Sequence, residues 1–216
     1  MDHQPRTAAI ILAAGTSSRM GEAGNKLLLP LHTRPVLAHV IEAVLGSRAR
    51  PIILVLGHQA EEVKAHIRPA LREDALEIVE NADYAQGQST SMKAGLRALL
   101  TSHAEQDLAS VIFLLGDQPM ITPAMIDRLI AQREQTGRLI ALPLYGGRRG
   151  NPVIFSLELV PELLRVDGDE GGRSIIKRHP REITALEMGE EAANFDVDTW
   201  DAYQQVQAAW EQKMLE

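Results

Sequence analysis

The chain has 216 residues, 45% of them hydrophobic but only 4% aromatic, so its core must rest on Leu, Ile, Val and Ala. Its formal net charge of −7 at pH 7 argues against non-specific binding to nucleic acid or an anionic membrane, although a local group of cations could still hold a phosphate. Cysteine is absent, which excludes disulfides, thiolate metal sites and a cysteine nucleophile.

The N-terminal segment does not have the pattern of a signal peptide, because its apolar stretch stops at Gly15. No apolar run approaches the roughly 18 residues that cross a membrane. We therefore expect a cytoplasmic protein, in keeping with a cysteine-free chain in a reducing compartment, with neither a membrane nor a nucleic acid as its partner.

Short apolar runs alternate with amphipathic stretches through most of the chain. The predicted strands of the first part cover residues 8–14, 51–57, 75–80 and 110–117. The predicted helices cover residues 35–47, 59–71, 89–100 and 122–137. The last helix is the best marked, with Thr122 as its N-cap and Gly137 at its end. The third is expected to begin with capping hydroxyls, and the second to be interrupted at Pro69.

The second part is less regular. Its predicted elements are two strands within residues 139–156 joined by a Gly/Arg turn, helices over 157–166 and 174–179, a strand over 182–188 and a final helix over 199–213. Strands of continuous Ile, Leu and Val separated by helices favour a mostly parallel sheet covered on both faces. With no linker or repeat, we expect one domain over residues 1–216, with a core from about 7 to 200.

Ligands of such sheets bind at the carboxyl ends of the strands, so the residues that follow each strand are the candidate site. Gly15 to Lys26 follow the first strand, Gly116 to Pro119 follow the fourth, and "NFDVDTW" follows the last. Groups that bind phosphate therefore come from one strand end, and carboxylates come from two others.

The loop after the first strand fits neither the Walker A spacing nor GxGxxG. Gly15 permits close approach of a backbone, Ser17 and Ser18 offer hydroxyls, and Arg19 offers a fork for phosphate oxygens. Lys26 adds a point charge on the far side of the loop. The spacing alone is equally typical of a plain strand-to-helix turn with a solvated arginine.

Three acidic residues follow apolar strands. Asp117 follows "VIFLLG", and a poorly hydrated carboxylate at the end of so apolar a strand needs a partner such as a divalent cation or a helix N-terminus. The alternative is a cap on the turn before Pro119. Asp196 and Asp198 would point to one face of an extended segment, unless they belong to a helix cap at Thr199. Oxygen ligands from two separate segments suit Mg²⁺, which usually takes one or two carboxylates plus substrate phosphates.

Two further loops are rich in Gly and Arg. Residues 147–153, "GRRGNPV", are typical of a hairpin turn with solvated arginines or of an anion contact. Residues 168–174, "GDEGGRS", enter a helix with Arg173 near its N-terminus, and favour either an anion site or a loop with a capping Asp. The seven histidines have no metal-binding spacing, and no GxSxG occurs, so hydrolase chemistry is disfavoured.

Taken in order, "LAAGTSSRMG…NKLLLPL", "FLLGDQPMI", "GGRRGNPVIF", "GDEGGR" and "FDVDT" resemble the MobA-like nucleotidyltransferases, and within them the molybdenum cofactor cytidylyltransferases. The resemblance covers nearly the whole chain. It implies a three-layer α/β/α Rossmann-like nucleotidyltransferase fold with a mostly parallel mixed sheet. It also implies transfer of a nucleoside monophosphate from an NTP to a phosphorylated acceptor, with release of pyrophosphate.

The resemblance also implies roles for particular residues. The nucleotide-binding positions are Leu12, Ala13, Ala14, Gly15, Ser18, Arg19, Lys26 and Ser91. The metal positions are Asp117, Asp196 and Asp198, for Mg²⁺ with Mn²⁺ as the alternative. The catalytic positions are Arg19, Lys26 and Asp117, and the acceptor-binding positions are Arg148, Arg149, Asn151 and Arg173. "Ala-Ala-Gly" at the first loop is similar to the cytidylyl branch, whereas guanylyl relatives usually carry "Ala-Gly-Gly".

The expected activity is therefore Mg²⁺-dependent transfer of CMP from CTP to molybdopterin or the molybdenum cofactor, giving the cytosine dinucleotide form. A recipient molybdoenzyme or its chaperone is an expected partner. The alternatives are guanylyl or other NMP transfer, CTP with a small alcohol or sugar phosphate, a non-catalytic cofactor chaperone, and a nucleotide sensor. Two departures from the family pattern are a longer loop before Lys26 and Trp200 in place of a proline.

Overall fold

The computed structural model describes residues 6–68, 76–189 and 195–215. Its main sheet has the strand order β10-β7-β9-β6-β1-β4-β5, with β8 paired to β7. These strands are β1 (Arg6–Ala13), β4 (Ile52–Leu56), β5 (Glu77–Glu80), β6 (Leu108–Leu115), β7 (Ile140–Tyr145), β8 (Arg148–Arg149), β9 (Val153–Ser156) and β10 (Ile183–Glu187). A separate pair is formed by β2 (Pro30–Leu31) and β3 (Arg34–Pro35).

Most neighbouring strands of the main sheet run parallel. β1 is parallel to both β4 and β6, and β10 is parallel to β7. β9 is antiparallel to β6 and to β7, and this reversal makes the sheet mixed. The expected mostly parallel mixed sheet is confirmed.

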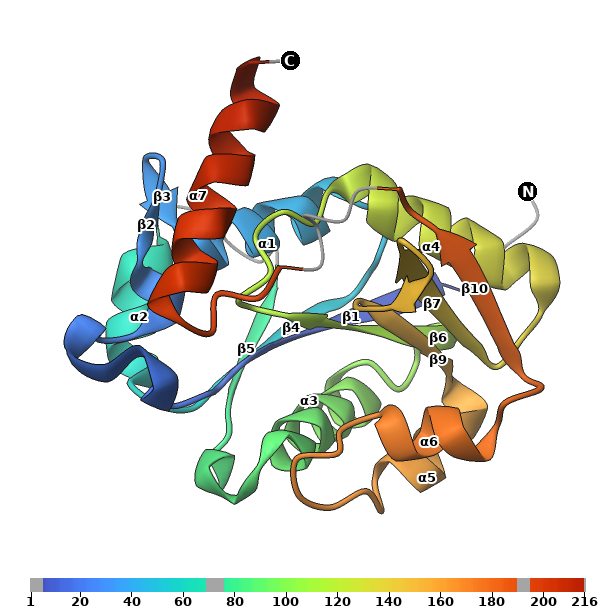
Figure 1. Cartoon of the computed structure of the whole chain (residues 1–216). Helices are drawn as coiled ribbons and strands as arrows, with labels where there is room; N and C mark the ends of the chain where they lie inside the picture. The colour runs from blue at the N-terminus through green and yellow to red at the C-terminus, as the bar shows by residue number, and fades with distance from the viewer. Residues whose placement is uncertain (1–5, 69–75, 190–194, 216) are drawn as a thin grey trace.

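Helices cover both faces of the sheet (Figure 1). One layer holds α1 (Val36–Gly46), α2 (Ala60–Ile67), α4 (Pro123–Thr136) and α7 (Trp200–Leu215). The other holds α3 (Gln88–Ser102), α5 (Val160–Leu163) and α6 (Arg173–Arg178). Short 3-10 turns are η1 (Ser18–Ala23), η2 (Lys26–Leu28), η4 (Tyr84–Gln86) and η5 (Leu157–Leu159). None of the described helices is long and apolar enough to cross a bilayer.

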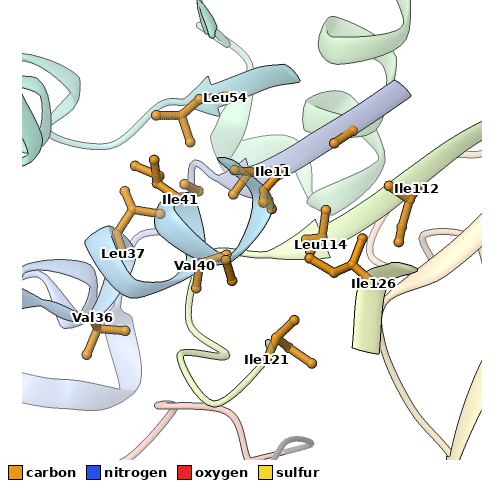
Figure 2. Close-up of a cluster of buried hydrophobic side chains, with 14 of the residues drawn as sticks. Ile11, Val36, Leu37, Val40, Ile41, Leu54, Ile112, Leu114, Ile121 and Ile126 are labelled. Atoms are coloured by element: carbon orange, nitrogen blue, oxygen red, sulfur yellow. The ribbon is translucent and has the colours of Figure 1, made fainter. Parts of the chain in front are cut away.

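The core lies in two parts, one on each side of β1. Ala9 and Ile11 pack with α1 and α4, whereas Ala8 and Ile10 pack with α3, as the two-residue period of a strand requires. Figure 2 shows the first part, where strand side chains such as Ile11 face α1. Complete burial of each such side chain contributes about 1.5–3 kcal/mol, so the two clusters hold the strand ends in place.

The predicted helix ends are partly confirmed. Thr122 accepts a hydrogen bond from Met125 N at 3.3 Å, and Gly137 ends α4 with φ 64°. The expected start of α3 is wrong: its N-cap is Gly87, and the hydroxyls lie within its first turn. The physical reason is that Asp169 Oδ1, from a distant loop, accepts from Gln88 N at 3.1 Å and caps the helix instead.

Two other expected helices differ in extent. The expected end of the second helix, residues 69–71, lies outside the described residues. The helix expected over 157–166 is a 3-10 turn followed by α5, which ends at Leu163.

Candidate active site

Three segments far apart in sequence meet at the carboxyl ends of β1 and β6. The two strands are paired in register up to Leu12 and Leu115, so the loops that follow them start side by side. The segment after the last strand is attached by a hydrogen bond from Val197 N to Asp117 O at 3.0 Å. The site expected from the strand-end rule is therefore assembled in the fold.

The first loop is closed by its own polar side chains. Ser17 has φ 55°, and its Oγ accepts from Lys26 N at 3.1 Å. Asn25 Oδ1 accepts from Leu27 N at 3.1 Å. These bonds fix the backbone at Lys26, so that its side chain reaches the end of β6.

Lys26 lies between two carboxylates. Its Nζ donates to Asp117 Oδ2 and, at 2.5 Å, to Asp198 Oδ1, while Arg19 donates to Asp198 Oδ2 at 2.7 Å. The Lys26 and Asp117 side chains are only 13% and 14% exposed, whereas Arg19 is 73% exposed. Burial alone would lower the pKa of Lys26, but Asp117 and Asp198 together hold it above its ordinary value. The lysine is therefore a fixed cation at this site.

The pKa values of Asp196 and Asp198, the two acids of the last segment, shift in opposite directions. Burial first, and then the negative charge of Asp117, raise the pKa of Asp196 to about 6. Burial also acts to raise the pKa of Asp198, but hydrogen bonds from Lys26 and Arg19 outweigh it and lower that pKa. Asp196 Oδ1 instead accepts a hydrogen bond from Gln118 Nε2.

This raised pKa predicts a stability cost that appears as pH rises. Asp196 keeps its proton to a higher pH in the folded than in the unfolded chain, so its ionisation between about pH 4 and 6 favours unfolding. In metal-free protein, we expect Asp196→Asn to raise the free energy of unfolding at pH 7.5 by about 1–3 kcal/mol. The gain should shrink towards zero below pH 4. Urea unfolding in EDTA at both pH values measures it; an equal gain at both would contradict the prediction.

The arrangement of the acids differs from the sequence expectation. Asp198 N donates to Asp196 O at 2.9 Å, so the segment turns at Val197 and is not extended. The alternative cap at Thr199 is also present, because its Oγ1 accepts from Ala202 N at 3.2 Å and caps α7. The two acids therefore reach different partners and do not share one face of a strand.

The predicted three-carboxylate metal set is not gathered as one group. Within residues 6–68, 76–189 and 195–215, no three His, Cys, Asp or Glu side chains could jointly hold a metal ion. The physical reason is that the ammonium of Lys26 joins Asp117 to Asp198. Asp117 Oδ1, however, is buried without a hydrogen-bond partner among these residues. One such oxygen with substrate phosphates suits Mg²⁺ or Mn²⁺, so the metal assignment stays a prediction.

The predicted nucleotide-binding residues fall into two groups. Gly15, Ser18 and Arg19 are exposed at the loop, and Leu12 is half-buried beneath it. The Ala13 and Ala14 side chains are buried, which leaves mainly backbone for a ligand. Ser91 is buried in α3, where its Oγ accepts from Asn81 Nδ2 at 3.0 Å. Direct contact of a base with Ser91 stays a prediction.

Gly15 offers a sharp test of the nucleotide loop. Apart from its two chain neighbours, a Cβ placed on it would meet no atom of the described part of the chain within 4 Å, so the described fold does not require glycine there. We expect Gly15→Ala to leave the free energy of unfolding within about 0.5 kcal/mol of wild type. The KM for nucleotide should rise about tenfold, because the methyl group occupies the space that a ligand approaches.

Gly57→Ala is the matched control. Its Cβ would lie 2.7 Å from Tyr84 Cβ and 2.8 Å from Ala14 Cβ, so it should destabilise the fold by about 1–3 kcal/mol. Thermal unfolding and steady-state kinetics of both variants separate the effects. An unchanged nucleotide KM for Gly15→Ala would contradict the assigned role of the loop.

The predicted acceptor-binding residues separate into two places. Asn151 and Arg173 line a small pocket of about 130 Å³ together with Leu12 and Asp196. Arg148 and Arg149 form β8 and are exposed on a hairpin outside this pocket. The hairpin interpretation of "GRRG" therefore holds, and contact of these two arginines with an acceptor stays a prediction.

A larger cavity lies away from this site. It measures about 1370 Å³ and lies near the amino ends of β1, β4 and β5, where Arg6, Ile52 and Glu77 line it. The carboxylates and cations described above are at the opposite ends of the strands. We locate the active site by that convergence of charged groups, not by cavity size.

Three amide side chains of the site were not predicted from the sequence. Asn25 closes the first loop, Asn81 holds Ser91, and Gln118 holds Asp196. Asn81 directly follows a predicted strand, and Gln118 directly follows Asp117, so position after a strand was the available signal. A neutral amide gave no charge pattern that would have distinguished it from a turn residue.

Comparison with known proteins identifies the family. The model of the MobA-like NTP transferase domain matches residues 9–183. The chain belongs to the MobA-like NTP transferase family. This NTP transferase is therefore a nucleotidyltransferase, and a nucleoside triphosphate is its substrate.

Individual relatives agree with this membership. Nicotine blue oxidoreductase of Paenarthrobacter nicotinovorans is 29% identical over 205 residues, covering 90% of this NTP transferase and 93% of the relative. The crystal structure of an Rv0371c homologue from Mycobacterium sp. strain JC1 has a TM-score of 0.81 and 29% identity, covering 98% of both chains. Rv0371c of Mycobacterium tuberculosis, solved with manganese, has a TM-score of 0.74 and 25% identity, covering 94% and 99%.

Proposed function

We propose that the protein transfers CMP from CTP to molybdopterin or the molybdenum cofactor, in a reaction that depends on a divalent cation. The observation that carries this proposal is the convergence of Arg19, Lys26, Asp117 and Asp198 at the ends of β1 and β6. Family membership supports the use of an NTP. The choice of CTP and of this acceptor is supported by the sequence resemblance, including "Ala-Ala-Gly" at residues 13–15.

The reaction joins two anions and therefore needs positioning and charge compensation more than a strong base. An oxygen of the acceptor phosphate attacks the α-phosphorus of CTP. The bond from that phosphorus to the bridging α–β oxygen breaks, and pyrophosphate leaves with the electron pair. Arg19 donates hydrogen bonds to the triphosphate. Lys26 holds the charge that develops on the leaving group, close to where its ammonium already lies.

We assign the cation to Asp117, Asp196 and Asp198. Because these three carboxylates do not form one group in the described residues, substrate phosphates would complete its coordination. When bound, the cation would neutralise charge on the phosphates and align them for in-line displacement. The unpaired, buried Asp117 Oδ1 supports this role, because an oxygen without a hydrogen bond suits a hard cation. Rv0371c, solved with manganese, supports a divalent cation for this chain, and we propose Mg²⁺ with Mn²⁺ as a substitute.

The acceptor is proposed to enter through the pocket of Asn151 and Arg173, because Asp196 lies on the same pocket wall. We further propose that residues 1–216 form one domain, and that a recipient molybdoenzyme or its chaperone takes the product.

Pyrophosphate release with each of the four NTPs tests the proposal, using Mg²⁺ and molybdenum cofactor as acceptor. Release that depends on the acceptor and occurs with CTP alone is the expected result. Release with GTP would overturn the base assignment and keep the enzyme class. The absence of release with any NTP, in protein that still binds the cofactor, would favour the chaperone.

A further inference from the structure

Gln118 is buried in a manner that stability alone does not explain. Its side chain is only 1% exposed, its Nε2 donates to Asp196 Oδ1, and its Oε1 is buried without a partner among the described residues. An unpaired buried polar atom costs the folded state about 1–3 kcal/mol. An apolar side chain of the same size would avoid this cost, so the amide needs another reason to be there.

Among the described residues, five buried side-chain polar atoms lack a hydrogen-bond partner; Arg133 Nε and Trp210 Nε1 lie in α4 and α7, and the other three, including Gln118 Oε1, belong to the segments of the site. Asn25 Nδ2 and Asp117 Oδ1 are also buried without partners in the described part of the chain. Both residues belong to the segments that meet at the ends of β1 and β6. Polar groups left unpaired at one place are typical of a site arranged for a ligand and not for stability.

The position of Gln118 accounts for the orientation of the Asp196 carboxylate. Gln118 N donates to Leu115 O at 3.3 Å, and its side chain is enclosed, so the amide is held at the end of β6. Asp196 comes from the separate segment beyond β10. Among the described residues, the amide of Gln118 is the group that donates a hydrogen bond to its carboxylate. The orientation of Asp196 thus depends on a residue adjacent to Asp117.

We propose that Gln118 is a positioning residue that fixes the carboxylate of Asp196 for the divalent cation. This inference rests on the proposed function, because it requires Asp196 to be a metal ligand. Hydrogen-bond partners of ligating groups are typically worth 10–100-fold in metal affinity. Gln118 would also link the two acidic segments, so that Asp117 and Asp196 present their oxygens together.

A double-mutant cycle tests the proposal. Mn²⁺ affinity is measured by the EPR signal of free Mn²⁺, with each of the four NTPs in turn, for wild type, Gln118→Met, Asp196→Asn and the double variant. We expect Gln118→Met to weaken Mn²⁺ binding by about 10–100-fold. In the Asp196→Asn background the same change should have no further effect, because Gln118 acts through Asp196.

Two further variants complete the experiment. Gln118→Asn keeps the amide but is one methylene shorter, so it should lose Mn²⁺ affinity to the same extent. It replaces Gln118→Met in the experiment if that variant does not fold. Gln132→Met is the matched control, because Gln132 Nε2 donates to Thr184 Oγ1 at 3.0 Å, between α4 and β10. It should leave Mn²⁺ affinity unchanged. The thermal midpoint of metal-free Gln118→Met should stay near that of wild type, because removing the unpaired Oε1 offsets the lost hydrogen bond to Asp196, whereas a merely structural role would lower it.

The outcomes separate this inference from the proposed function. If Asp196→Asn weakens Mn²⁺ binding but folded Gln118 variants bind as wild type does, Gln118 has no positioning role and the metal site stands. An equal loss in both backgrounds also overturns the inference, because Gln118 would then act independently of Asp196. If wild type binds no Mn²⁺ with any NTP, or if Asp196→Asn binds Mn²⁺ as wild type does, Asp196 is not a metal ligand. The inference about Gln118 is then wrong as well.

Discussion

Replacing Asp117 by alanine is expected to lower turnover by at least about 100-fold, the scale of losing one main electrostatic stabiliser. The substitution removes the unpaired Oδ1, which we assign to the cation, and Oδ2, which holds Lys26. Steady-state pyrophosphate release at saturating nucleotide measures the effect. A loss of binding without a change in turnover would point to a role in the ground state only.

Asp127→Ala is the matched control for Asp117→Ala. Asp127 also accepts a hydrogen bond, from Arg48 N at 2.9 Å, but it belongs to α4, away from the carboxyl ends of the strands. Turnover of this variant should stay near that of wild type. A near-normal rate for Asp117→Ala, in folded protein, would contradict the metal and catalytic assignments of Asp117.

Lys26→Met is expected to have two opposite effects. Turnover should fall by about 100-fold or more, because the buried ammonium beside the leaving group is lost and the exposed Arg19 does not replace it. In protein without nucleotide, however, affinity for Mn²⁺ should rise, because the ammonium no longer occupies the space between Asp117 and Asp198. Lys26→Arg should not restore turnover, since the planar guanidinium cannot replace a compact ammonium between two acids.

Lys64→Met controls for the loss of a lysine that bridges two acids. Lys64 pairs with Glu61 and Glu80, but on the exposed surface of α2 and β5. Both the turnover and the Mn²⁺ affinity of this variant should match wild type. Normal turnover in Lys26→Met, or Mn²⁺ affinity that falls in parallel with turnover, would contradict the role of Lys26 as a cation that acts on the leaving group and lies between Asp117 and Asp198 when no metal is bound.

The layered fold was predictable because its central strands are long runs of branched apolar residues. β1, β4 and β6 are buried on both faces over most of their length, so their sequences are largely apolar, and helices separate them along the chain. β8 and the β2–β3 pair have two residues each, too few for any period to appear. The cap of α3 was missed because Asp169 lies 81 residues from Gln88.

The candidate site was predictable to the level of segments but not of contacts. The strand-end rule brought Lys26, Asp117 and Asp198 to one edge of the sheet. Their pairing spans 91 and 172 residues and depends on the turn at Val197, which the alternating pattern did not indicate. Gln118 and Asn25 were missed because a neutral amide becomes informative only when its burial and its partner are known.

The most direct test of nucleotidyl transfer at this site is to follow the phosphorus atoms of CTP. CTP labelled at the α-phosphorus, and separately at the γ-phosphorus, is incubated with Mg²⁺ and molybdenum cofactor, using wild type and Asp117→Ala. We expect the α-label in the cofactor product and the γ-label in pyrophosphate, with both transfers lost in the variant. Retention of the α-label in free nucleotide, with the γ-label as inorganic phosphate or on the acceptor, would contradict nucleotidyl transfer here.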